Sequence, residues 1–374
     1  MTSLLPASQR TGIPTARSVD HFAFTVPDLD QAVEFFTTTL GGELVYRLDR
    51  LVREDDWMSV HLDVDPRATA EIAMLRLGPT SNIELFEYTA PTQNTVPPRN
   101  NDVGGHHLAF YVDDVDAAVA YLSGRPGVRV LGTPQEMPEG SPNAGDRWIY
   151  FLTPWGMQME VHSVPQEMPY HQETDGRRFG PVAQWHNGDE SAPAGGIPTV
   201  RNVDHVAYTV ADLDASVAFF TEVLGAELLY RIGPLPLDAD VMSTQLNVHG
   251  AGTIEQAMLR LGPTDNIELF SYGVPGSSAH PPRNSDVGGH HLAFYVDDVD
   301  AAVAYLRAQD GVEILGEPET IPDGPIAGDR WVYFRTPIGI PMEVLNMPDG
   351  AMPYEAGTPA RRCDGGPVAW TNRP

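Results

Sequence analysis

The chain has 374 residues, a length typical of two or three domains, and its 42% apolar share is ordinary for a globular protein. It carries 51 acidic residues against 23 basic ones, all of them arginine, which gives a formal net charge of −28. This balance argues against binding to nucleic acid or to an anionic membrane surface, and the absence of lysine excludes Schiff-base chemistry and lysine general bases.

The compartment follows from two further features of the chain. Cys363 is the single cysteine, so no disulfide can form within the chain. The first 14 residues contain no apolar run suited to a signal peptide, and no segment is apolar enough to span a bilayer. We therefore expect a cytoplasmic protein, as a monomer or a homodimer, that acts on a small molecule.

The first predicted element is a strand over residues 19–26, where β-branched and aromatic residues alternate with others. Asp28 then stands at the N-cap position of a helix over residues 29–40, which Gly41-Gly42 ends. Three strands follow at residues 42–50, 70–78 and 82–88, and residues 57–64 are a candidate for one more. The order is β-α-β-β-β.

A second unit of the same kind begins at His107, which opens the pattern H-x-A-F-x-V as His21 does. Asp114 caps a helix that is predicted to run through Leu122. Strands are then expected at residues 128–131, 147–152 and 157–162. Each half of the chain is thus predicted to contain two β-α-β-β-β modules.

The whole arrangement occurs twice, because residues 102–122 recur letter for letter at residues 286–306. A tandem repeat of this size fixes the architecture as four modules, at about residues 18–95, 102–165, 202–275 and 286–348. We expect two domains, residues 1–190 and 197–374, joined by a flexible segment at residues 188–196. The tail of each half repeats as well, with Arg177-Arg178 matched by Arg361-Arg362, so each tail is expected to pack on its own half.

Four acid and imidazole side chains recur at nearly the same spacing, as His21, Glu84, His107 and Glu160 and again as His205, Glu268, His291 and Glu343. Two imidazoles and two carboxylates can neutralise and hold one divalent ion. The histidines lie in the first strands of their modules and the glutamates in the last. By strand parity, His21 shares a face with Ala23 and Thr25, which leaves Phe22 and Phe24 on the other face.

Paired modules with this ligand pattern resemble the vicinal oxygen chelate superfamily, which includes glyoxalase I, methylmalonyl-CoA epimerase, extradiol dioxygenases and bleomycin resistance proteins. The segments that carry the resemblance are NIELF, GGHHLAF, and TPWGMQMEV or TPIGIPMEV. It implies an α+β fold of two paired-module domains with curved mixed sheets. It also implies up to two divalent ions per chain, of Fe, Ni, Zn, Co or Mn.

The leading function implied by this resemblance is that of a metal-dependent isomerase or lyase of the glyoxalase type. Its substrate would present neighbouring oxygens to the ion, which stabilises an enolate while a glutamate moves the proton. Glu160 and Glu343 are the first candidates for this base, and Glu84 and Glu268 are the others.

Two other functions remain open. A ring-cleaving Fe(II) dioxygenase uses two histidines and one carboxylate, and Tyr150 and Tyr333 stand ten residues before Glu160 and Glu343, as in the extradiol motif. The histidine that this motif expects further upstream is absent, and the additional Glu84 is foreign to it. A small-molecule binding or resistance protein is the third candidate, although proteins of that class resemble this fold without the metal set.

Several other residues are weaker candidates for the site. Arg99 and Arg283 could meet an anionic substrate, although loop arginines more often form salt bridges. His162 has Leu345 as its counterpart and could line a pocket, so that the two halves bind different molecules; drift at the surface is the simpler reading. His106 and His290 point to the opposite face from the predicted ligands and are expected in the core. The sequence leaves open whether each site forms within one half or across both.

Overall fold

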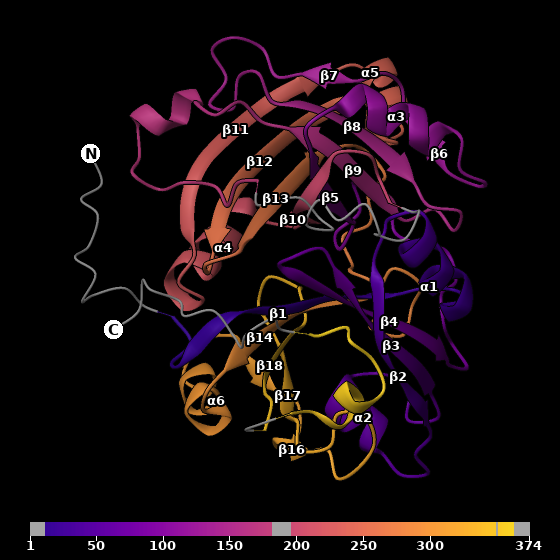
Figure 1. Ribbon diagram of the computed structural model, residues 1–374. Coiled ribbons are helices and arrows are strands. Elements are labelled where there is room, and N and C mark those ends of the chain that lie inside the picture. Colours follow the sequence, from indigo (N-terminus) through magenta and orange to yellow (C-terminus); the bar gives the residue numbers. More distant parts are fainter. Residues whose placement is uncertain (1–11, 182–195, 349–350, 363–374) are drawn as a thin grey trace.

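A computed structural model describes residues 12–181, 196–348 and 351–362, and these form two nine-stranded sheets with few helices (Figure 1). In sheet A, the first module supplies β1 (Ala16–Thr25), β2 (Glu43–Leu51), β3 (Thr69–Leu77) and β4 (Ser81–Thr89). The last module supplies β14 (His290–Val296), β15 (Glu313–Ile314), β16 (Glu319–Thr320), β17 (Arg330–Arg335) and β18 (Met342–Asn346).

Sheet B is built in the same way from the two middle modules. The second module supplies β5 (His106–Val112), β6 (Arg129–Val130), β7 (Gln135–Glu136), β8 (Arg147–Leu152) and β9 (Gln158–Ser163). The third supplies β10 (Val200–Thr209), β11 (Glu227–Leu237), β12 (Gly252–Leu261) and β13 (Asp265–Gly273). Both sheets are mixed. In each sheet, the two modules are joined by antiparallel pairing of their first strands.

The predicted two-domain division at residues 190–197 does not match this assembly, because each sheet takes one module from each half. At the centre of sheet A, β1 pairs antiparallel with β14, and at the centre of sheet B, β5 pairs with β10. The colours in Figure 1 show the exchange, with indigo beside orange in one sheet and magenta beside salmon in the other. The first strands share one sequence pattern. The segment between β4 and β5 crosses from sheet A to sheet B, where Gly104 N donates to Thr209 O of β10.

The helices are short and mostly begin where the sequence predicted. They are α1 (Leu29–Thr38), α2 (Trp57–Leu62), α3 (Val115–Ser123), α4 (Leu213–Ala218) continued by a π-helical turn (Phe219–Val223), α5 (Ala239–Gln245) and α6 (Val299–Arg307), with 3₁₀ turns at Pro169–Gln172 and Pro353–Ala356. The Asp28 carboxylate accepts a hydrogen bond from Gln31 N and so caps α1. The strand considered for residues 57–64 is wrong. Met58 and Leu62 are buried while Val60 is exposed, which is helical spacing.

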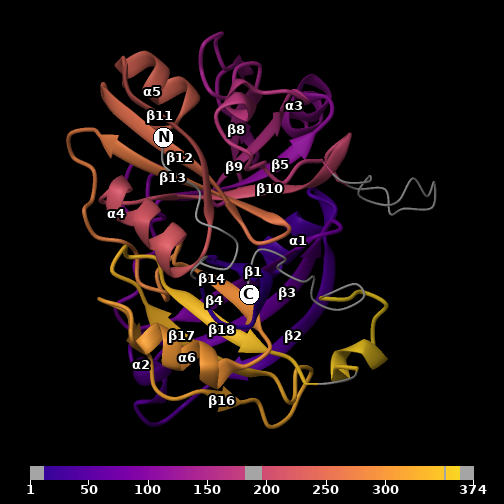
Figure 2. The same ribbon diagram turned by 90° about the vertical axis from the view of Figure 1, so that its left-hand side faces the viewer.

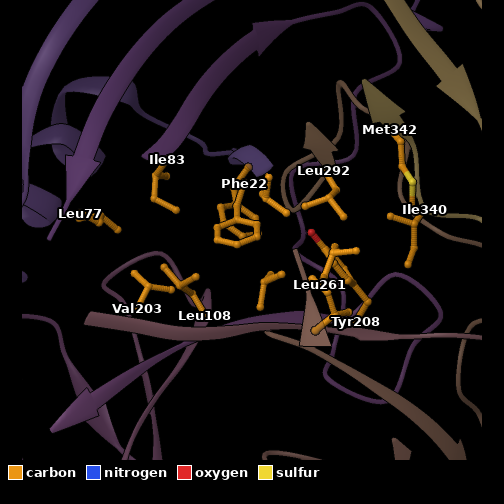
Figure 3. Packing of buried hydrophobic residues seen from close by; sticks show 14 of the residues in the cluster. Phe22, Leu77, Ile83, Leu108, Val203, Tyr208, Leu261, Leu292, Ile340 and Met342 are labelled. Atoms are coloured by element: carbon orange, nitrogen blue, oxygen red, sulfur yellow. The ribbon is translucent and has the colours of Figure 1, made fainter. Parts of the chain in front are cut away.

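One hydrophobic core lies between the two sheets and holds them together. It includes Phe22 and Phe24 of β1, Leu108 of β5 and Tyr208 of β10, all fully buried. Figure 3 shows Phe22, Leu108 and Tyr208 in this core. Helices α1, α3, α4 and α6 contribute their apolar faces to the same core, whereas α2 and α5 pack in two smaller clusters. A view turned by 90° keeps the two sheets as separate layers (Figure 2). Because Phe22 and Phe24 face this core, the alternate residues of β1, which include His21, face the opposite side of sheet A.

The repeated tails pack on their own halves, as expected, and also reach across to the other half. Met168 and Tyr170 of the first tail lie in a cluster with Tyr230 and Met258 of the second half. The second tail packs in the same way against the first module, where Tyr354 contacts Tyr46. Each tail therefore covers the sheet that its own half helped to build. Most of the expected joint, residues 188–195, and Cys363 lie outside the described residues. No described helix is long and apolar enough to cross a membrane.

Candidate metal centres

The register of sheet A brings four of the predicted residues onto one face at its centre. Ala23 lies opposite His291 in the β1–β14 ladder, and Ala293 lies opposite His21. Glu84 on β4 is beside Ala23, and Glu343 on β18 is beside Ala293. Alanine occupies the space between the two histidines, so the four longer side chains converge above it.

The donor atoms of this group, here called centre A, lie close together. Nε2 of His21 is 3.1 Å from Nε2 of His291, 3.2 Å from a Glu84 oxygen and 3.4 Å from a Glu343 oxygen. All four residues are buried, and their donor atoms lie within 4.8 Å of one another. Two imidazoles and two carboxylates at this spacing have the chemistry and the proximity to share one divalent ion.

Centre B repeats the arrangement in sheet B with His107, Glu160, His205 and Glu268. The two Nε2 atoms are 3.2 Å apart, and Glu160 Oε2 lies 3.1 Å from His107 and 3.3 Å from His205. The structure thus gathers all eight predicted residues into two centres. The four residues of one repeat do not form one set, because each centre takes a histidine and a glutamate from each half.

A carboxylate and a tail arginine fix one histidine of each centre. Nδ1 of His21 lies 2.7 Å from Asp20, and Nδ1 of His205 lies 2.9 Å from Asp204. This contact orients each ring so that its Nε2 atom points into the centre. Arg362 then donates to Asp20, and Arg178 donates to Asp204, each at 2.5 Å through Nη2.

Burial and neighbouring charge shift the pKa values of the glutamates in opposite directions. Burial alone would raise the pKa of Glu84, but the His21 and His291 imidazoles outweigh it and hold that pKa well below its usual value. The same balance, set by His107 and His205, lowers the pKa of Glu160. Both side chains are therefore carboxylates at neutral pH, which is the form that a cation or a proton-transfer step requires.

The two tyrosines of the dioxygenase hypothesis lie beside the centres. The Tyr333 hydroxyl is 3.2 Å from His291 Nε2, and the ring of Tyr150 packs edge-on against His107. Burial, reinforced by the nearby glutamates, raises the pKa of both phenols well above the usual value. They are neutral hydroxyl groups at physiological pH and cannot act as bases there.

Arg99 and Arg283 are engaged elsewhere. Arg99 donates to Asp102 at 2.8 Å and to the Gly276 carbonyl at 2.6 Å, while Arg283 makes the equivalent pair with Asp286. Neither arginine lines the cavity above centre A. Their role in the structure is to join the connecting segments of the two halves.

His162 is buried rather than on the surface. Its Nδ1 lies 3.1 Å from Asp146 and its Nε2 lies 3.3 Å from Asp204, so it stands behind His205. Although burial opposes the charge, Asp204 and Asp146 raise the pKa of His162 to about 9. His162 therefore contacts Asp146 and Asp204, the two carboxylates that support centre B.

His106 and His290 are in the core, as expected. Their rings are 5.0 Å apart, and they pack against Phe24 and Tyr208. Burial lowers the pKa of His106 to about 4 and that of His290 to about 3, so both are neutral.

Sequence reasoning missed the groups that support the centres: Asp20, Asp204, Asp146, Asp329, Arg178 and Arg362. A signal for them was present, because V-D-H, G-D-R-W and the tail R-R pair each occur once in both halves. Only contact in space links these short motifs, which are separated by up to 342 residues in the Arg362–Asp20 bond.

Comparison with known proteins supports the same family twice along the chain. The superfamily described as Glyoxalase/Bleomycin resistance protein/Dioxygenase matches residues 20–151 and again residues 202–344. The chain is 58% identical over 174 residues to 2-epi-5-epi-valiolone epimerase from Actinomyces sp, which covers 46% of this chain and 94% of the epimerase. It is 31% identical over 130 residues to the mitochondrial methylmalonyl-CoA epimerase of Bos taurus, covering 34% of this chain and 65% of that protein.

Among solved structures, glyoxalase I from Zea mays has the same fold. The TM-score is 0.52 at 19% identity, and the match covers 88% of this chain and 92% of that one. The bovine epimerase is spanned to just under two thirds of its length, whereas the Actinomyces epimerase is spanned almost completely by about half of this chain. Two family matches, a nearly complete relative and a shared two-sheet fold show that the chain is a tandem enzyme of the Glyoxalase/Bleomycin resistance protein/Dioxygenase superfamily.

Proposed function

We propose that this protein is a divalent-metal-dependent epimerase that acts on a ketone with neighbouring oxygens. The observation that carries the proposal is the pair of buried His-Glu-His-Glu centres, in each of which four donor atoms converge. The 58% identity to 2-epi-5-epi-valiolone epimerase favours epimerisation of a related ketone over the other reactions of the superfamily.

The donor sets suit a divalent ion on two grounds. In each centre, the carboxylates and imidazole nitrogens are those that first-row divalent metals prefer. In centre B, the buried Glu160 Oε2 atom lies near the Nε2 atoms of His107 and His205, yet it accepts no well-formed hydrogen bond from the described part of the chain. His21, Glu84, His291 and Glu343 would hold one ion, and His107, Glu160, His205 and Glu268 the other.

When bound, the ion would stabilise negative charge on the substrate oxygens as a proton leaves the adjacent carbon. The residues of the chain supply the proton movements. Glu343 is the first candidate to take the proton from the carbon beside the carbonyl group and to release it to solvent afterwards. Glu84, a carboxylate at neutral pH, would first take a proton from solvent and then return it to the opposite face of that carbon. A two-base inversion needs one group on each side of the carbon, and the two glutamates come from β18 and β4, on opposite sides of the paired β1 and β14.

The first experiment tests the base. Glu343→Gln combined with Glu160→Gln should lower turnover of 2-epi-5-epi-valiolone by about 10³-fold or more, because an amide cannot accept the proton. Product formation and solvent deuterium incorporation are followed by NMR, and circular dichroism checks that the fold persists. Glu222→Gln, an exposed glutamate, is the matched control. Full activity in the double variant would refute the assignment.

The same protein preparation separates the alternative functions. The second carboxylate in each centre favours proton transfer over the two-histidine, one-carboxylate set of a dioxygenase. Metal analysis that finds Fe, together with oxygen uptake on catechols, would support the dioxygenase. Tight ligand binding by metal-free protein without turnover would support a binding protein.

A further inference from the structure

Centre A lies at the floor of a cavity of about 430 Å³ that is large enough for a small ring substrate. Its floor includes His21, Glu84 and Glu343. Its outer wall is formed by Trp57 of α2, Trp331 of β17 and Glu319 of β16, which we call the indole wall. The wall therefore combines one module from each half.

Contacts within the indole wall hold its carboxylate in place. Trp57 Nε1 donates to Glu319 Oε1 at 2.9 Å, and His61 Nε2 lies 3.2 Å from the same oxygen. Among the described residues, no donor reaches the second oxygen, Oε2, and the Glu319 side chain is 37% exposed. The rings of Trp57 and Trp331 meet edge to face with their centroids 5.9 Å apart. One carboxylate oxygen beside an aromatic surface is thus left for a ligand.

Charge at the cavity mouth argues against an anionic substrate. Asp49, Asp323 and Glu319 line the mouth, while the two lining arginines are Arg53 and Arg362. Arg362 is already bound to Asp20 and Asp329, and the Arg53 guanidinium lies 4.8 Å over the Trp57 ring. A phosphate or carboxylate ligand would meet repulsion here, whereas neutral hydroxyl groups could donate to the carboxylates.

The corresponding positions around centre B are different. Gln135 pairs with Trp148 in the ladder where Glu319 pairs with Trp331, so it takes the place of the wall carboxylate. By the 184-residue displacement, Val241 replaces Trp57. Gln256 replaces Ile72, and its amide Nε2 donates to Glu268 Oε1 at 3.0 Å. Centre B therefore keeps the four convergent side chains and one wall indole, Trp148, but lacks the second indole and the wall carboxylate. One of its own carboxylates is held by a neutral amide.

We propose that the indole wall binds a neutral, polyhydroxylated cyclic ketone and that this recognition belongs to centre A alone. The proposal rests on the proposed epimerase function and names its substrate class. The C–H face of the ring packs against the Trp331 indole and the edge of Trp57, whose ring is stacked on His61 and covered by Arg53. Ring hydroxyl groups donate to Glu319 Oε2. The carbonyl group and a neighbouring oxygen then lie toward Glu84 and Glu343.

The test replaces wall residues by their centre B counterparts, which the fold already accommodates. Trp57→Val and Glu319→Gln should each raise the KM for 2-epi-5-epi-valiolone by about tenfold or more, with kcat changed less than about threefold. Calorimetric titration with 2-keto-myo-inositol should show the same loss of affinity. The controls are Val241→Ala and Gln135→Ala at centre B, which should leave both measurements unchanged, and circular dichroism checks folding.

The outcomes distinguish this proposal from the proposed function. Turnover by wild-type protein with no effect of Trp57→Val or Glu319→Gln would overturn the wall while the epimerase stands. Binding of 2-keto-myo-inositol that depends on the wall, without turnover of the valiolone, would support the wall and contradict the epimerase. Equal losses in the centre A and centre B variants would overturn the restriction to centre A. Wild-type protein that neither binds nor turns over either ketone would overturn both.

Discussion

Asp265 is a buried carboxyl group at the position that Ser81 occupies in the first half. It is 4% exposed, and Thr264 Oγ1 donates to it at 2.8 Å. Burial raises the pKa of Asp265 to about 7, although Arg260 and Arg76 act in the opposite direction. The carboxyl group is consequently protonated in the folded protein over a range where it ionises in the unfolded chain.

This difference predicts a pH-dependent stability. From about pH 4 to about pH 7, the folded state retains a proton that the unfolded state has lost, so the free energy of unfolding falls as pH rises. Asp265→Ser should remove this loss and stabilise the protein at pH 8 by about 2–4 kcal/mol, with little change below pH 4. Urea unfolding at several pH values measures the difference.

Asp265→Asn provides a second variant, because its amide keeps the shape without ionising. It should follow the serine variant in pH dependence even if packing shifts its absolute stability. Parallel stability curves for the wild type and both variants would contradict the raised pKa.

At the scale of elements, the two tails act as anchors through one arginine each. Arg178 and Arg362 have side chains that are 3% exposed, and they bind the fully buried Asp204 and Asp20. The neighbouring Arg177 instead donates to backbone carbonyls at the surface. In each centre, the tail arginine thereby neutralises the buried aspartate that contacts the histidine.

Loss of one anchor should cost far more than loss of its neighbour. Arg178→Met leaves the Asp204 carboxylate buried without its main cation, and we expect the free energy of unfolding to fall by about 3 kcal/mol. Arg177→Met should change it by less than about 0.5 kcal/mol. Urea unfolding of both variants checks this, and equal effects would show that the tail is held by other contacts.

At the scale of the whole molecule, the main feature is that both centres are shared between the halves. Centre A joins β1 and β4 to β14 and β18, and centre B joins β10 and β13 to β5 and β9. Neither half contains a complete centre. Histidines that are 270 residues apart in sequence therefore belong to one site.

Metal stoichiometry tests this pairing. If the wild type binds two divalent ions, then His21→Ala and His291→Ala should each remove the same ion, and the double variant should still bind one. His21→Ala with His107→Ala should remove both, because these residues lie in different centres. Metal content is measured after dialysis, with the exposed His280→Ala as the control. Loss of both ions from the His21 and His291 pair would contradict the cross-half arrangement.

The local sequence pattern predicted much of the fold correctly. The period of two in residues 19–26 assigned Phe22 to the core and His21 to the opposite face, and Asp28 and Asp114 marked helix starts correctly. It was less reliable at residues 57–64, where a short apolar run fits a strand or a helix, and α2 formed because Met58 and Leu62 share one buried side. The predicted strand at 128–131 shortened to two residues, and β7 was not foreseen.

The sequence by itself determined the four modules, the family and the eight convergent side chains, because repetition and alternation are local properties that each strand carries. Only the tertiary structure decided which modules pair, since the first strands of all four share one pattern that does not specify a partner. It also decided that the two centres have different side chains around them. The contact of Trp57 with Glu319 and that of Gln256 with Glu268 depend on residues that no local pattern relates.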